Sequence, residues 1–221
     1  MFILKTMLIS TVIVLSANAA MAAQTGVVGL YKNGAGLDEA AANALGCSVQ
    51  RQGAIFAQQG KTKIDQPDQF VVLACDQPVL GQRESRSALA DLFDGGANVA
   101  LFEGALAEFD VPDDQPAISE RQYILKLGYY NNLDLTGRAS DLQALDRKVS
   151  DRGGRWTTEA FLNVYNAMGV ATPDEVVILY YDSAEIADRF REENQDILVD
   201  VGTFNAVHLT GFAYLVGLAS R

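Results

Sequence analysis

Residues 67–76 read PDQFVVLACD, and residues 173–182 read PDEVVILYYD. The two stretches start 106 residues apart and are identical at five of their ten positions. Each begins with Pro-Asp, continues as a short apolar run rich in β-branched or aromatic residues, and ends in Asp. This pattern is typical of a buried strand between two turns. The recurrence predicts that the chain contains two copies of one α/β unit.

Further strands and helices are predicted around the repeated stretches in both halves. The predicted strands cover 27–31, 69–75 and 98–109 in the first half, and 123–130, 175–181 and 205–218 in the second. The predicted helices cover 38–45 and 83–93, then 140–151 and 183–199. Ser140 is a credible N-cap and Gly46 a credible stop for two of these helices. Each half then reads β-α-β-α-β, which indicates an α/β layer fold.

We expect the two halves to pair into one sheet of about six strands, with the helices packed on it. One alternative is two small sheets packed face to face. Another is two ferredoxin-like α+β halves, in which the long third strands fold back at Gly104 and Gly211. The halves differ before the repeated stretch, because 157–169 favours an extra helix whereas 54–57 favours a strand or loop.

The N-terminal residues have the character of a targeting segment. Residues 1–23 place Lys5 before the uncharged apolar run 6–17 and follow it with small residues, as in a secretory signal peptide. The run is shorter than the roughly 20 residues that span a bilayer. The expected organisation is therefore a signal peptide at 1–23, a first repeat at 24–112, an acidic, proline-containing linker at 113–120 and a second repeat at 121–221. This predicts a periplasmic or secreted protein without a membrane span after cleavage.

Charge and cysteine content narrow the classes of partner and site. The chain has 17 basic and 28 acidic residues, a net charge of −11, which argues against nucleic acid and anionic membranes as partners. Its two cysteines, Cys47 and Cys75, are expected to form a disulfide in an oxidising compartment. The alternative is two buried free thiols. No Cys-x-x-Cys or His pair accompanies them, so neither a metal site nor a cofactor is predicted.

Named catalytic motifs are absent from the sequence. It contains no phosphate-binding Gly-x-x-x-x-Gly-Lys-Ser/Thr loop, no Gly-x-Gly-x-x-Gly and no Gly-x-Ser-x-Gly. His208 is the only histidine, so any Ser-His-Asp triad would have to use it. Its position within a predicted strand favours a core or interface residue over a general base or metal ligand.

The second half is richer in aromatic and amide side chains, which can line a ligand pocket. The candidate ligand-binding residues are Tyr130, Asn132, Arg155, Trp156, Tyr181, Asp182 and His208. Each of these residue types also has a structural explanation. Tyr and Trp can seal a sheet–helix boundary, and either Asp182 or Ser183 can cap the helix that follows.

These observations favour an exported α/β protein that binds a small molecule or another protein of the cell envelope. The alternative is a hydrolase or lyase that uses carboxylate, Tyr and Arg groups of the second repeat. A third hypothesis is a structural subunit of an envelope complex. The sequence does not decide whether the protein is an enzyme, which a perturbed carboxylate or tyrosine inside a pocket would indicate.

Overall fold

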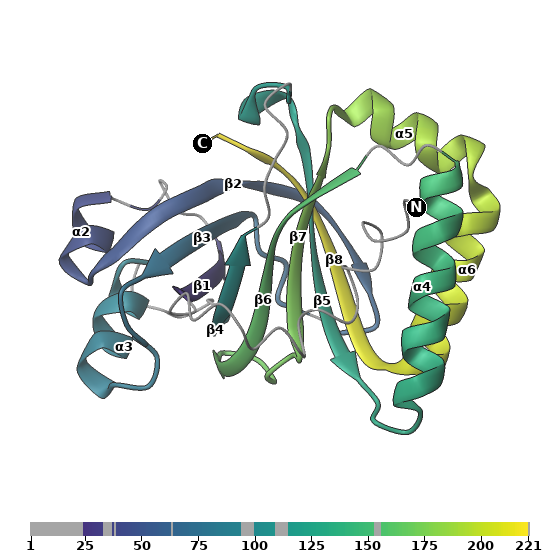
Figure 1. Ribbon diagram of the computed structural model, residues 1–221. Helices are drawn as coiled ribbons and strands as arrows, with labels where there is room; N and C mark the ends of the chain where they lie inside the picture. The colour runs from purple at the N-terminus through teal and green to yellow at the C-terminus, as the bar shows by residue number, and fades with distance from the viewer. Residues whose placement is uncertain are drawn as a thin grey trace, which may run out of the picture.

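The computed structural model describes residues 24–32, 37, 39–62, 64–93, 100–108, 115–152 and 156–220. In these residues eight strands form a closed barrel in the order β1-β3-β2-β8-β5-β7-β6-β4, with every neighbouring pair antiparallel (Figure 1). The strands are β1 Gln24–Tyr31, β2 Cys47–Gly60, β3 Gln69–Cys75, β4 Ala100–Glu108, β5 Gln122–Tyr130, β6 Trp156–Met168, β7 Glu175–Tyr181 and β8 Leu209–Ala219.

The helices lie outside the barrel, on two opposite sides of it (Figure 1). The helices α2 Glu39–Ala44 and α3 Arg83–Asp91 belong to the first half of the chain. The helices α4 Leu135–Asp151, α5 Ala184–Glu193 and α6 Gln195–His208 belong to the second, and a 3-10 turn at Ile118–Glu120 precedes β5. None of the helices in the described part of the chain combines the length and apolar character needed to cross a membrane.

The predicted six-stranded, duplicated β-α-β-α-β sheet is wrong, because the strands close into one antiparallel barrel. The first half orders its elements β-α-β-β-α-β, and the second does the same except that two helices, α5 and α6, lie between its last two strands. The halves are not separate sheets, since β2 pairs with β8 and β4 pairs with β6. Closure leaves no sheet edge exposed, so the barrel hides its apolar interior without a second layer.

Two strands join the halves, and neither was predicted in full: 54–57 favoured a strand or loop, and 157–169 favoured a helix. The region around 54–57 belongs to the long strand β2, and the extra helix predicted at 157–169 is instead β6. In β6, Ala160 and Leu162 lie in the barrel interior with Val164 packed against it, a period of two rather than of a helix. Pairing with β4 and β7 on both sides outweighs the Thr and Gly signals that indicated helix ends.

The end of the chain was also assigned incorrectly. The predicted helix at 183–199 is divided into α5 and α6, and α6 continues to His208. The strand predicted from 205 therefore begins only at Leu209, so His208 is helical. The N-cap of α4 is Asp134, whose side chain accepts a hydrogen bond from the Gly137 amide, and not Ser140.

The repeated stretches form strands as predicted. They are β3 and β7, whose bounds keep the offset of 106 residues. They take matching places in the order of the two halves, β4-β1-β3-β2 and β8-β5-β7-β6. Duplication of an ancestral unit remains a prediction. The proposed signal peptide and the first part of the linker, up to residue 114, lie outside the described residues.

Three apolar clusters stabilise the molecule. Inward-facing side chains from all eight strands fill the barrel, among them Phe70, Phe102 and Leu125, each 0% exposed. A second cluster lies between the first-half sheet and α2 and α3, and a third lies under α4, α5 and α6. The predicted disulfide between Cys47 and Cys75 is confirmed, and it joins β2 to β3 within the second cluster.

Candidate functional site

The structure separates the predicted ligand residues into three places. Tyr130 ends β5 beside His208, since the Asn131 amide donates to the His208 carbonyl at 2.9 Å. Trp156 and Tyr181 lie at the opposite end of the same sheet. Asn132 is exposed, and Asp182 is half-buried just before α5. Arg155 lies outside the described residues.

Trp156 and Tyr181 belong to a packing cluster. Their rings meet edge to face, with centroids 5.9 Å apart, and Phe190 of α5 lies 5.5 Å from the Trp156 ring. Burial raises the pKa of Tyr181 to about 12. Ser183, and not Asp182, caps α5 by accepting a hydrogen bond from the Ile186 amide at 3.2 Å. This arrangement is that of aromatic residues sealing a sheet–helix boundary.

A polar cluster surrounds Tyr130 on the outer face of the second-half sheet. The Glu175 carboxylate on β7 accepts hydrogen bonds from Lys126 Nζ at 2.9 Å and from the Tyr130 hydroxyl at 2.8 Å. The Lys126 and Glu175 side chains are only 15% and 10% exposed. Alternation along β5 makes this possible, because Tyr123, Leu125 and Leu127 face the interior and leave the even-numbered positions to face outward.

The absence of a side chain at Gly128 leaves room for the Glu175 side chain. Gly128 pairs directly with Glu175 across β5 and β7. A Cβ on Gly128 would come within 3.0 Å of a Glu175 carboxylate oxygen and 3.1 Å of its Cγ. The missing side chain therefore lets the carboxylate lie across the strand and reach both of its donors.

Helix α4 completes the cluster with Arg138. Its guanidinium carbon lies 4.1 Å from the centre of the Tyr130 ring, a cation–π contact. The buried Nη1 of Arg138 has no hydrogen-bond partner among the described residues. Buried guanidinium nitrogens normally have hydrogen-bond partners, so this nitrogen lacks the partner that its burial calls for. We call Lys126, Tyr130, Arg138 and Glu175 the second-half polar cluster.

Helix α6 adds polar and aromatic groups to the same face. Asn205 exchanges hydrogen bonds with the Tyr214 hydroxyl of β8 at 3.1 and 3.3 Å. His208 is 2% exposed, with its Nε2 at 2.7 Å from an Asp141 oxygen of α4 and its ring against Phe204. A metal ion at this nitrogen would have to displace Asp141. No group of three or more metal-ligating side chains occurs within the described ranges.

The electrostatics of the cluster keep Tyr130 and Lys126 protonated at neutral pH. Burial raises the pKa of Tyr130, and the Glu175 carboxylate raises it further while Lys126 opposes the effect. Burial alone lowers the pKa of Lys126, but the Glu175 charge more than compensates, so the pKa lies above its ordinary value. Tyr130 is thus a neutral phenol that donates a hydrogen bond, beside a lysine that stays charged.

The apolar surface around the cluster is incompletely covered. The outward side chains of this sheet that are half-buried rather than buried include Ile124, Val177, Phe212 and Val216. A mostly apolar surface with a few convergent polar groups is what small-molecule sites present.

Most of the cluster was missed by sequence reasoning. Lys126, Arg138 and Glu175 were not candidates, and Asn205 and Tyr214 were not singled out as ligand residues. One signal was present: Lys126 interrupts the apolar strand Tyr123–Tyr130, where a charge needs a partner. The partner, Glu175, comes from another strand and could be found only with the pairing register.

Comparison with known proteins gives a fold and no family. No protein-family model matches the chain, and no curated protein matches it. A chlorite dismutase from Candidatus Nitrospira defluvii has the same fold, with a TM-score of 0.55, 11% identity and coverage of 90% of this chain and 92% of the other. An anthrone oxidase-like protein has a TM-score of 0.52, 10% identity and coverage of 90% and 92%. At this identity, what the chain shares with these proteins is the barrel fold.

Proposed function

We propose that this protein is an enzyme that acts on a small oxygen-containing molecule bound over the second-half polar cluster. The observation that carries the proposal is the unpartnered, buried Nη1 of Arg138, held over the ring of Tyr130. A charged donor in this state costs free energy in the unliganded protein. A bound oxygen atom would remove that cost, which supports a substrate with a carbonyl, phenolate or oxyanion group.

Each member of the cluster has a separate role in this proposal. Arg138 binds a substrate oxygen, and Tyr130 donates a hydrogen bond from its neutral phenol. Glu175 orients the Tyr130 hydroxyl, and Lys126 forms an ion pair with Glu175. The half-buried apolar side chains of β5, β7 and β8 hold the rest of the molecule. These are the carboxylate, Tyr and Arg groups that the enzyme alternative of the sequence analysis required.

The reaction class that we propose to test first is redox chemistry on an oxygen-containing molecule. Its support is the fold alone, since the proteins of similar fold include a chlorite dismutase and an anthrone oxidase-like protein. We also propose that the protein acts in the periplasm or outside the cell. The signal-like residues 1–23 and the Cys47–Cys75 disulfide support this location.

The test measures binding and turnover of chlorite and of a hydroxylated anthrone by the purified chain. We expect one of the two to raise the melting temperature and to be consumed. Arg138→Gln should then lower kcat/KM or affinity about tenfold or more, since a hydrogen bond to a charged group contributes about 1.5–3 kcal/mol. Arg147→Gln, an exposed residue of the same helix, is the control and should change neither.

Three outcomes separate the hypotheses. Turnover that Arg138→Gln abolishes supports the enzyme. If the protein binds one of the compounds without turning it over, and this binding depends on Arg138, the result supports a small-ligand-binding protein, as the sequence analysis first suggested. Equal behaviour of Arg138→Gln and Arg147→Gln contradicts a site at this cluster.

A further inference from the structure

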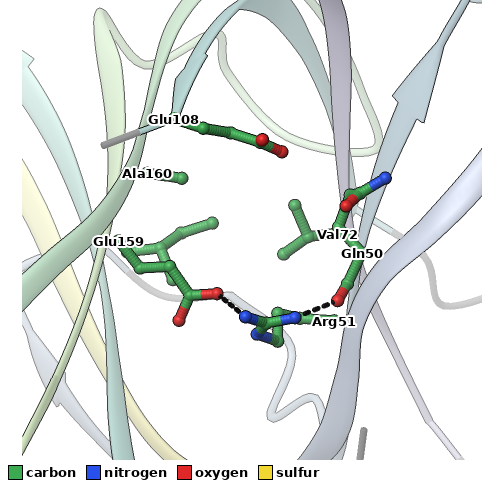
Figure 2. Close-up of a pocket in the computed structure, with 7 residues that line it drawn as sticks. Gln50, Arg51, Val72, Glu108, Glu159 and Ala160 are labelled. Carbon is green, nitrogen blue, oxygen red and sulfur yellow. Dashed lines mark hydrogen bonds and ion pairs between the residues drawn. The ribbon is translucent and has the colours of Figure 1, made fainter. Parts of the chain in front are cut away.

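A second polar network closes one end of the barrel, at the starts of β2 and β6. Arg51 of β2 forms an ion pair with Glu159 of β6 (Figure 2). The Tyr123 hydroxyl donates a hydrogen bond to the other Glu159 oxygen at 2.8 Å. Arg51 Nε also donates to the Tyr123 oxygen at 3.2 Å. Arg121 approaches Glu159 at 3.9 Å, so one buried carboxylate serves two guanidinium groups.

A cavity of about 130 Å³ opens beside this network. Its inner wall is apolar and consists of Val72, Ala160 and Ile178, which are 3%, 5% and 1% exposed and belong to the barrel core. Its outer wall is polar, with Gln50 next to Arg51 and Glu108 across from the Arg51–Glu159 pair (Figure 2). An engineered apolar cavity of about 150 Å³ holds benzene, so this one suits a compact molecule of similar size.

The donors and acceptors beside the cavity that have no hydrogen-bond partner indicate which kind of ligand would fit. A guanidinium has five N–H donors. Three of those of Arg51 are used by Tyr123, Glu159 and the Gln50 carbonyl, the last at 2.6 Å, so two remain. Both Glu159 oxygens are occupied. The Glu108 carboxylate has no hydrogen bond or ion pair within the described ranges, and it faces the cavity (Figure 2).

We propose that this cavity is a binding site for a small zwitterion that carries an ammonium group at one end and an acceptor oxygen at the other. The ammonium group pairs with Glu108, and the acceptor oxygen takes the spare N–H groups of Arg51. The short carbon chain between them lies on Val72, Ala160 and Ile178. This site lies at the barrel mouth, away from the second-half polar cluster, and is independent of the function proposed above.

The probe is 4-aminobutyrate, titrated into the full protein by calorimetry. Butyrate, which lacks the ammonium group, and n-butylamine, which lacks the acceptor oxygen, are the truncated probes. We expect 4-aminobutyrate to bind with a dissociation constant of about 1 mM or below, and each truncated probe to bind about tenfold more weakly. Loss of one hydrogen bond to a charged group accounts for a factor of this size.

Variants locate the binding. Glu108→Gln should weaken 4-aminobutyrate about tenfold, and the protein should keep its fold because Glu108 is exposed. Glu192→Gln, an exposed residue of α5, is the matched control and should bind as the native protein does. Ala160→Leu should fill the cavity and abolish binding. Arg138→Gln should leave the affinity unchanged, which separates this site from the second-half polar cluster.

The proposal is overturned if 4-aminobutyrate does not bind the native protein at millimolar concentration. It is equally overturned if Glu108→Gln binds as tightly as Glu192→Gln, or if butyrate binds as tightly as 4-aminobutyrate.

Discussion

The two halves of the barrel have the same strand order but differ in how their outer faces are covered. On the first-half face, Val27, Val71, Leu73 and Leu101 are each 0% exposed beneath α2 and α3. On the second-half face the corresponding side chains of β5, β7 and β8 are often half-buried. One face is packed closed, whereas the other keeps polar groups among partly accessible apolar ones.

A buried carboxylate on each face shows the same contrast. Glu103 of β4 is 0% exposed and accepts hydrogen bonds from the backbone amides of Val79 and Leu80, the latter at 2.9 Å. It therefore fixes the loop before α3. Glu175 instead binds two side chains, Lys126 and Tyr130. The first carboxylate holds a backbone loop, whereas the second holds two side chains that belong to the proposed site.

The largest effect is expected from the disulfide of the closed face. Replacing Cys47 and Cys75 together with alanine should lower the free energy of unfolding by roughly 3.5 kcal/mol, since the bridge closes a loop over a separation of 28 residues. Urea unfolding of the double variant checks this, with the reduced native protein as a second comparison. A loss below about 1 kcal/mol would show that the first half does not depend on the bridge.

Breaking the Lys126–Glu175 ion pair on the second-half face should lower the free energy of unfolding by about as much as removing the disulfide. Glu175→Gln leaves Lys126 buried without its partner, which typically costs about 3 kcal/mol. The double variant Lys126→Met with Glu175→Gln should recover much of that loss, because no buried charge remains unpaired. A double-mutant cycle from urea unfolding measures the coupling. If the losses of stability in the two single variants simply add in the double variant, the pair is solvated and the cluster is more open to solvent than the structure shows.

Alkaline pH should destabilise the second half through Tyr181. The folded-state pKa of about 12 exceeds the ordinary value of 10.0 because burial disfavours the phenolate. The stabilisation is therefore complete below pH 10 and falls as the pH rises to 12, by roughly 2–3 kcal/mol. Unfolding measured across this range should show the fall, and Tyr181→Phe should reduce it. An equal fall in Tyr181→Phe would assign the effect to other tyrosines.

The smallest expected effects on stability come from the N-cap residues of helices α5 and α3, and they should differ. Ser183→Ala should cost about 1 kcal/mol, because the side chain caps α5. Gln82 occupies the equivalent place before α3 and forms no side-chain cap hydrogen bond, so Gln82→Ala should change stability by less than about 0.5 kcal/mol. Thermal unfolding of both variants makes the comparison, and equal losses would contradict it.

Local signals in the sequence were sufficient for some elements and not for others. The repeated stretches predicted β3 and β7 correctly, because a buried strand of seven residues between turns has a strong local pattern. Strand β6 was predicted as a helix, and β2 was recognised only as a strand or loop around 54–57. Both strands are long, partly polar and defined by pairing with both neighbours. Closure of the barrel depends on β2–β8 and β4–β6, pairings between distant segments that a single sequence does not reveal.

The candidate site shows the same limit. Tyr130 was named from clustering in the sequence and His208 because it is the only histidine, and both lie on the second-half outer face. Arg138 could not be named, because it is one of many helical arginines until the fold places it over Tyr130. The disulfide was predictable because two cysteines allow one intramolecular pairing.

The central claim is that the second-half face binds ligand whereas the first-half face is closed. Ring-labelled tyrosine observed by NMR during titration with a hydroxylated anthrone or chlorite tests it directly. The resonances of Tyr130 and Tyr214 should shift with saturation, while that of Tyr31, buried on the first-half face, should not. A shift of Tyr31 without a shift of Tyr130, or no saturable shift of Tyr130 with either compound, would contradict the account.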